Sequence, residues 1–300
     1  MRAIKFTPSR TGLIDLIEET IRQGGSDLHL KAPGRPHIRV GDRLVPTPHD
    51  RVTAQEMRQL MAVLLEMSGE EPHLAATQDT RFSMGIEGLG RFRVQAGRQR
   101  GSWGVVIHVI ATEAPTLSAL GLDAAGATVV GRKSGLVLVG GGRRRQTAIG
   151  ALVHEYNRCV PGHIVSIEEP MDYLHRDHRA SVTQREVGED VADFYGGVVA
   201  ALRQDPDALA VSDIPDVATA EAVLRATEEG LLVFAGIAAL DGSQAVRAFL
   251  RRFPSAQEPE MHTRLLEVLR GVISVPNVGE AGFEALDDGA EEAIEAQCVA

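Results

Sequence analysis

The sequence predicts an α/β protein in which a small α+β unit precedes a larger core of alternating strands and helices. Short runs that are apolar on both faces, as buried parallel strands are, cover residues 136–139, 163–167, 208–211 and 231–237. Segments with helical apolar spacing follow these runs at residues 147–156, 191–202 and 219–227. That order favours a doubly wound or related sheet.

Residues 1–111 are expected to form the smaller unit. Its strands are predicted at residues 26–30, 37–40, 43–45, 82–86, 91–96 and 102–110, with glycine-containing turns between several of them. One helix carries apolar side chains from Leu13 to Ile21 and ends at Gly24-Gly25. A second helix begins at a capping box formed by Thr53 and Glu56.

The remaining boundaries follow from composition. Residues 112–116, which contain Pro115, are a predicted linker, and residues 117–275 are the predicted core. A last helix is expected over residues 259–272. Residues 276–300 are rich in Asp and Glu and are predicted to be a solvated acidic tail.

Bulk properties exclude several classes of protein. With 300 residues and a net charge of −10, the chain as a whole is not expected to bind nucleic acid. No apolar stretch approaches the ~20 residues of a membrane span, and residues 1–10 lack an apolar signal core. Cys159 and Cys298 are too few for a disulfide framework, and neither has metal-ligand spacing around it. A reducing, cytoplasmic setting is expected.

The stretch GLVLVGGGRRRQT, residues 135–147, has the frame of a phosphate-binding loop. A buried strand runs into three glycines and then a helix, so backbone N–H groups and a helix N-terminus could hold an anion. Such a loop should end in Gly-Lys-Ser or Gly-Lys-Thr, and here no lysine follows the glycines. The nearest lysine, Lys133, precedes the strand.

Seven further motifs occur along the chain in a fixed order. They are residues 25–30 (GSDLHL), 91–94 with 98–101 (RFRV, RQRG), 115–117 with 120–122 (PTL, LGL), 162–164 (GHI), 167–170 (IEEP), 184–188 (QREVG) and 201–207 (ALRQDPD). In these motifs the chain resembles the ATPases of type II and type IV secretion systems. The resemblance is greatest to the type IV pilus retraction (PilT-type) branch, and it extends from about Leu13 to about Val275.

The resemblance implies a PAS-like N-terminal domain followed by a RecA-like P-loop NTPase core. It implies a homo-oligomeric ring of six copies that binds ATP or ADP with Mg²⁺ between the two domains. The predicted location is the cytoplasm or the inner surface of the inner membrane. The predicted assembly is either this homo-oligomer or a hetero-assembly with an active pilus or secretion ATPase, and the inner-membrane platform protein is a further predicted partner.

The glycine turn departs from the family. Its nucleotide-binding positions are Gly140, Gly141, Gly142, Arg143, Arg144, Arg145, Gln146 and Thr147. Arg145 falls at the lysine position and Gln146 at the Ser/Thr position, and the turn is about two residues short. Arginine is a planar fork and does not replace a compact lysine in a tight loop. The alternatives are an exposed basic turn that binds nothing, weakened nucleotide binding, and ordinary binding.

Three carboxylates occupy catalytic positions of the resemblance. Glu168 and Glu169 follow a buried strand where the family has a metal-assisting Glu-Asp pair, and the alternative is a cap on the turn before Pro170. Asp213 replaces a glutamate that handles the attacking water, and the lost methylene makes Asp213 a predicted relic. Two functional histidines of the family are replaced by Leu231 and Ala238. The chain's other histidines are expected to be surface or turn residues.

Arg91, Arg93, Arg98 and Arg100 are arginine-finger candidates by the same resemblance. Arg91 and Arg93 alternate along a strand and so project from one face. Ionic contacts across a domain or subunit interface are an equal alternative.

Changes at four catalytic elements, with fold motifs retained, favour a pseudo-ATPase: a structural or regulatory subunit in pilus-dependent (twitching) motility or secretion. The alternative is an active, slow, ATP-hydrolysing hexameric motor. A paralogue without function is a third hypothesis.

Overall fold

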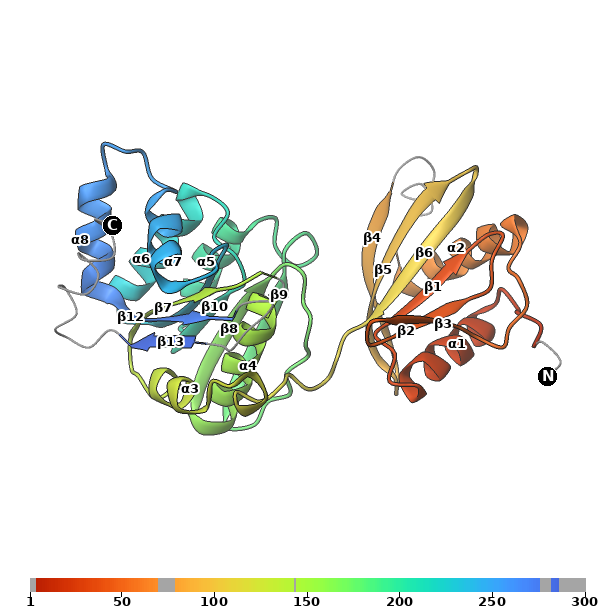
Figure 1. Cartoon of the computed structure of the whole chain (residues 1–300), viewed down its shortest axis with the longest axis horizontal. Coiled ribbons are helices and arrows are strands. Elements are labelled where there is room, and N and C mark those ends of the chain that lie inside the picture. The colour runs from red at the N-terminus through yellow and green to blue at the C-terminus, as the bar shows by residue number, and fades with distance from the viewer. Residues whose placement is uncertain (1–3, 70–78, 143, 276–281, 286–300) are drawn as a thin grey trace. The chain divides into compact units, whose positions relative to one another are not determined.

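The protein is described by a computed structural model, which covers residues 4–69, 79–142, 144–275 and 282–285 (Figure 1). The chain divides into two compact units, Met1–Ala111 and Thr112–Ala300. Arg143 and most of the predicted acidic tail lie outside the described residues.

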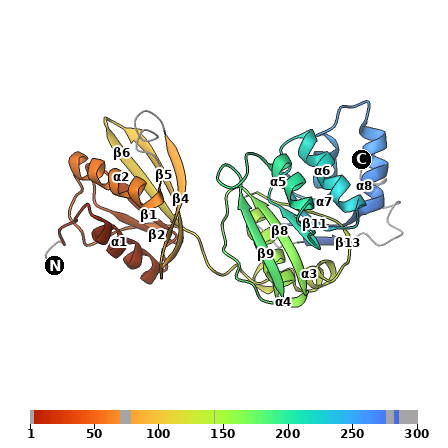
Figure 2. The same cartoon turned by 180° about the vertical axis from the view of Figure 1, so that it is seen from behind.

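The N-terminal unit is a six-stranded sheet with two helices on one face (Figures 1 and 2). Its strands, in the spatial order β3-β2-β1-β6-β5-β4, are β1 (Asp27–Lys31), β2 (His37–Val40), β3 (Arg43–Pro46), β4 (Thr80–Ile86), β5 (Gly90–Gln99) and β6 (Ser102–Val109). The helices are α1 (Arg10–Arg22) and α2 (Ala54–Ser68). The predicted capping box starts α2, with both Thr53–Glu56 hydrogen bonds present.

The larger unit is built on a seven-stranded sheet in the order β13-β12-β7-β11-β10-β8-β9. Its strands are β7 (Gly135–Gly140), β8 (Gly162–Glu168), β9 (Ala180–Glu186), β10 (Ala208–Val211), β11 (Leu232–Ile237), β12 (Leu269–Ser274) and β13 (Gly282–Ala285). Only the β12–β13 pair is antiparallel among these described strands. The predicted α/β class and parallel core are confirmed.

Helices cover both faces of this sheet. They are α3 (Asp123–Val130), α4 (Arg144–Cys159), α5 (Phe194–Leu202), α6 (Val217–Glu228), α7 (Gly242–Leu250) and α8 (Glu258–Val268). Successive strand residues point to opposite faces, so Leu136 and Leu138 pack with α5 to α8 while Val137 and Val139 pack with α3 and α4. This double burial explains why the strands read as unbroken apolar runs.

Several sequence predictions were wrong in detail. The helix expected over residues 259–272 ends at Val268, and β12 begins at Leu269. Gly282–Ala285 of the predicted tail forms β13 and pairs with β12. Three elements, β9, α3 and α7, were not predicted from the sequence. No helix among the described residues is long and apolar enough to span a membrane.

Candidate functional site

The predicted site residues of the core gather at one edge of the sheet. β7, β11, β10 and β8 are parallel neighbours, so their carboxyl ends meet there. Gly140 ends β7, Glu168 ends β8, and Asp213 lies two residues after the end of β10. Helix α4 begins at the same edge with Arg144.

The glycine turn is closed against the ends of two other strands. The N–H of Gly141 donates to the carbonyl of Ala239 at 2.6 Å, and the N–H of Val275 donates to the carbonyl of Gly140 at 3.0 Å. Gly141 has a φ of 141°, and a Cβ there would lie 2.6 Å from the Val275 oxygen. Glycine is therefore required at residue 141 by backbone packing alone.

The first turn of α4 carries the basic residues. The helix starts at Arg144, three residues before the predicted start, so Arg144 to Thr147 are helical and not part of the turn. Arg145 Nη2 lies 3.3 Å from Asp213 Oδ1, with the two side chains 14% and 32% exposed. The ion pair joins the residue predicted for the family's lysine position to the residue predicted for its glutamate position.

A second contact closes the same edge. The Gln146 side-chain amide donates to the Glu169 carbonyl. The N–H of Glu169 in turn donates to Ser212 Oγ at 2.9 Å. These bonds tie α4, the end of β8 and the end of β10 together, while the Glu169 side chain is exposed and Thr147 is half-buried.

Glu168 lies in a less solvated position than Glu169. One of its oxygens, Oε1, accepts hydrogen bonds from Ser166 Oγ at 2.6 Å and Gln184 Nε2 at 3.0 Å. Burial raises the pKa of Glu168 to about 7, although these two hydrogen bonds act in the opposite direction. The carboxyl group is therefore partly protonated near neutral pH, which weakens it as a ligand for a cation.

Three of the groups expected to hold a nucleotide phosphate and Mg²⁺ are engaged with the protein. The Gly141 N–H is donated to Ala239, the Arg145 guanidinium faces Asp213, and the Gln146 amide faces Glu169. Gln146 also lacks the hydroxyl that would contact Mg²⁺. In this arrangement these three groups are directed at the protein itself.

The two replaced histidine positions lie at opposite ends of β11. Leu231 precedes the strand, and Ala238 follows it as an exposed residue at the edge of the glycine turn. Only the second position is near the site, and its methyl group offers no hydrogen bond.

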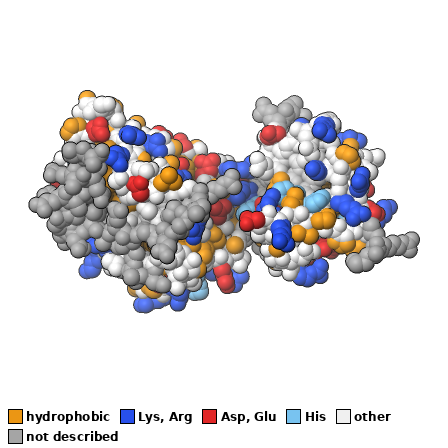
Figure 3. Space-filling view, in the orientation of Figure 1, with side chains coloured by type: hydrophobic (Ala, Val, Ile, Leu, Met, Phe, Trp, Pro, Cys, Tyr) orange, Lys and Arg blue, Asp and Glu red, His pale blue; other side chains and the backbone are white. Residues whose placement is uncertain are grey.

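The arginine-finger candidates are divided between two faces of the N-terminal sheet. Arg91 and Arg93 project from β5 on the face that α1 and α2 leave open, where Arg93 is in register with His108 and His108 with Asp27. Basic side chains are spread over the visible surface of this unit (Figure 3). Arg98 instead stacks on the Trp103 ring, 4.1 Å from its centroid.

Arg100 belongs to the tight turn between β5 and β6. It has a φ of 48° and precedes Gly101, with a φ of 75°. This backbone is that of a two-residue hairpin turn, so Arg100 does not share the open sheet face with Arg91 and Arg93.

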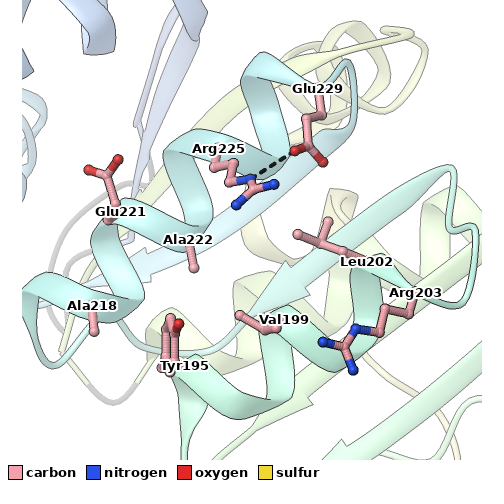
Figure 4. Close-up of a pocket in the computed structure, with 9 residues that line it drawn as sticks. All are labelled: Tyr195, Val199, Leu202, Arg203, Ala218, Glu221, Ala222, Arg225 and Glu229. Atoms are coloured by element: carbon pink, nitrogen blue, oxygen red, sulfur yellow. Dashed lines mark hydrogen bonds and ion pairs between the residues drawn. The ribbon is translucent and has the colours of Figure 1, made fainter.

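A separate hollow lies between α5 and α6 (Figure 4). Its lining includes Val199, Leu202 and Ala222, and at its rim Arg225 Nε pairs with Glu229 Oε1 at 2.8 Å. None of the predicted site residues lines it.

The Arg145–Asp213 pair was not predicted from the sequence, although the positions of both residues at strand or helix ends gave a usable signal.

Comparison with known proteins gives a consistent result. The family model "Type II/IV secretion system protein" matches residues 6–265. The chain is 31% identical to the type IV pilus retractation ATPase PilT of Pseudomonas aeruginosa over 276 residues, covering 90% of this chain and 79% of that protein. It is 30% identical to the type IV pilus ATPase PilU of the same organism over 262 residues, 86% of this chain and 68% of that protein.

Solved structures share the fold. A crystal structure of the pilus retraction motor PilT with bound ADP superposes with a TM-score of 0.83 at 29% identity, covering 95% of this chain and 86% of that one. The Legionella pneumophila ATPase DotB superposes with a TM-score of 0.80 at 18% identity, covering 99% of this chain and 88% of that one, and supports the fold alone.

Proposed function

The chain belongs to the type II/IV secretion system protein family, as its motifs predicted, and from this premise we propose that it is a catalytically degenerate member. It acts as a structural or regulatory subunit in pilus-dependent motility or secretion. The similar proteins named as pilus ATPases, PilT and PilU, support a pilus-linked role.

The Arg145–Asp213 ion pair at 3.3 Å is the observation that carries the proposal. A phosphate-binding cation and a water-activating carboxylate have to face the nucleotide from separate positions. Here the two side chains at those positions neutralise each other. Since removal of one electrostatic contact to a transition state costs about 10²–10³ in rate, loss of several removes most of the turnover.

The proposed partners follow from the family. The protein joins a ring, as a homo-oligomer or together with an active pilus or secretion ATPase, and contacts the inner-membrane platform protein. It works in the cytoplasm or at the inner membrane's inner surface. The core motifs at residues 162–170 and 184–188, which lie on β8 and β9 and their flanking turns, support retention of the shape on which such an assembly depends.

A slow, active ATPase is the second candidate. It is favoured by the retained acidic charge of Asp213 and Glu169 at the same sheet edge as the glycine turn. In that case Arg145 must leave Asp213 when nucleotide binds, and binding depends on Mg²⁺.

Calorimetric titration of the full chain with ATP and ADP, with and without Mg²⁺, and a phosphate-release assay test the proposal. We expect no Mg²⁺-dependent binding and no turnover above background. Turnover at the family's level that disappears in Asp213→Ala would overturn it.

Arg145→Lys tests whether the rest of the cleft is intact. Arg203→Lys, at an exposed arginine that follows α5, is its matched control. Nucleotide binding gained by the first variant alone would place the defect at residue 145. If neither variant gains nucleotide binding, the shortened glycine turn also contributes to the defect.

A further inference from the structure

A polar pocket lies at the far end of α4 from the glycine turn. It has a volume of about 490 Å³, and His154, Arg158, His175, Arg176 and His178 contribute to its lining. Residues 112–116, which leave the N-terminal unit, supply part of its wall. At 1.5 Å per residue, His154 is about 14 Å along the helix from Arg145, so this histidine pocket is separate from the candidate nucleotide site.

The three imidazoles converge on the pocket. The His154 ring centroid is 6.3 Å from that of His175 and 6.5 Å from that of His178. Within the described part of the chain, no hydrogen bond or ion pair engages these rings or the Arg176 guanidinium. Unused N–H donors from two elements therefore face one hollow.

The fold holds these donors in place. Asn157, which is 1% exposed, donates from Nδ2 to the Arg176 carbonyl at 2.7 Å and accepts from the His178 N–H at 3.0 Å. The His175 N–H donates to Gln184 Oε1 at 2.8 Å. The segment from His175 to His178 is thus fixed against α4 and β9 by its backbone, which leaves its side chains available.

Two guanidinium groups supply the positive charge at the pocket. Arg158 and Arg176 face it, while the acidic groups nearby are the exposed Glu113 and the half-buried Glu155, which pairs with Arg158 at 3.7 Å. Burial, and to a lesser extent Arg158, lowers the pKa of His154, and burial lowers the pKa of His175 to about 4. Neutral imidazoles still donate one N–H each.

A metal ion fits less well. The described residues contain no group of His, Cys, Asp or Glu side chains arranged to hold one, and two guanidinium groups would repel it. Donors that approach from different elements suit the tetrahedrally arranged oxygens of phosphate better than a planar carboxylate.

We propose that the histidine pocket binds a phosphate-bearing small molecule through Arg158, Arg176 and the three imidazoles, and that this ligand joins residues 112–116 to the core. The pocket volume is within the range of small-molecule sites. Because residues 112–116 follow the N-terminal unit directly, the bound ligand stabilises the segment that connects the two units.

The test uses the full chain with histidine ring signals resolved by NMR and inorganic pyrophosphate as the probe. The signals of His154, His175 and His178, assigned through single His→Asn variants, should shift with pyrophosphate while the His163 signal stays in place. Hydrogen exchange at residues 112–116 should slow in the same samples. Equal shifts with acetate at the same concentration would contradict recognition of phosphate.

Variants that each remove one arginine charge test where the anion binds. Arg176→Gln should weaken pyrophosphate binding about tenfold, because it removes one charge-assisted hydrogen bond to the anion. Arg203→Gln, which removes an equally exposed arginine elsewhere on the core, should change affinity by less than about twofold. Loss of binding in Arg144→Gln with full binding in Arg176→Gln would place the anion at the glycine turn and overturn the proposal. Equal losses of pyrophosphate affinity in Arg144→Gln, Arg176→Gln and Arg203→Gln would contradict the proposal, because they would indicate only general attraction by positive charge.

Discussion

Arg145 and Asp213, which lie on different elements of the core, meet with 3.3 Å between Nη2 and Oδ1. The contact joins the first turn of α4 to the segment after β10, across the sheet edge that was predicted from the sequence as the nucleotide site. Because Arg145 is only 14% exposed, removal of Asp213 alone would leave a poorly solvated charge.

A double-mutant cycle on Arg145→Gln and Asp213→Asn measures this pair. We expect a coupling free energy of about 0.5–1.5 kcal/mol in urea denaturation, because the pair is partly shielded from solvent. The pair of Arg158 and Glu155, which are 3.7 Å apart with Arg158 54% exposed, is the matched comparison and should couple by less. Equal coupling in both cycles would mean that Arg145 and Asp213 do not form a stable contact in solution.

Gly141→Ala should destabilise the core by about 2–4 kcal/mol without any nucleotide present. Its Cβ would lie 2.6 Å from the Val275 carbonyl oxygen, at a φ that L-residues rarely adopt. Gly85→Ala is the control, since nothing lies within 4 Å of a Cβ there and its φ is not positive. Midpoints of urea unfolding compare the two, and equal stability of Gly141→Ala and the natural chain would refute the closed turn.

Glu168 should give a pH-dependent contribution to stability. Its pKa rises from 4.5 to about 7 on folding, so the folded state holds the proton more tightly. The unfolded state releases its proton first as pH rises, and stability falls between about pH 4.5 and 7. The free energy of unfolding of Glu168→Gln should therefore rise by about 2 kcal/mol, relative to that of the natural chain, between pH 4.5 and 7.5.

Urea midpoints at several pH values measure this difference. Glu169→Gln, in the same turn but exposed, is the control for removal of a carboxylate from this edge. If the urea midpoint of Glu168→Gln differs from that of the natural chain by the same amount at pH 4.5 and at pH 7.5, the burial of Glu168 is contradicted.

Asn157→Ala should release the segment that carries His175 and His178. Two side-chain hydrogen bonds are lost, which corresponds to about 2 kcal/mol of local stability. The His178 amide should exchange with solvent roughly 10–100-fold faster. Gln23→Ala removes one exposed side-chain bond, to Glu19, and should leave exchange at His178 unchanged. Unchanged exchange in Asn157→Ala would show that other contacts hold the segment.

Much of the core could be predicted from the sequence, since buried parallel strands are apolar on both faces and β7 runs into glycines. The end of α8 could not, because Val268, Leu269 and Val272 continue an apolar pattern with no proline or cap where helix gives way to β12. β9 was missed because its exposed and half-buried polar residues, such as Gln184 and Arg185, resemble a loop.

The site was predictable in place but not in its contacts. Strand-end positions indicated that Gly140, Glu168 and Asp213 share an edge. The pairing of Arg145 with Asp213 and the gathering of three histidines depend on side-chain directions between distant segments. Local spacing carries no information on those directions.

β13 has a consequence for any shortened form of this protein. It occupies the outer side of β12, pairing Gly271 to Ser274 with Gly282 to Ala285. A chain that stopped at Val275 would present a row of unpaired N–H and C=O groups on a largely apolar strand. Such a truncated protein should self-associate through that strand, and its oligomers would mimic a natural assembly while arising only from the missing strand.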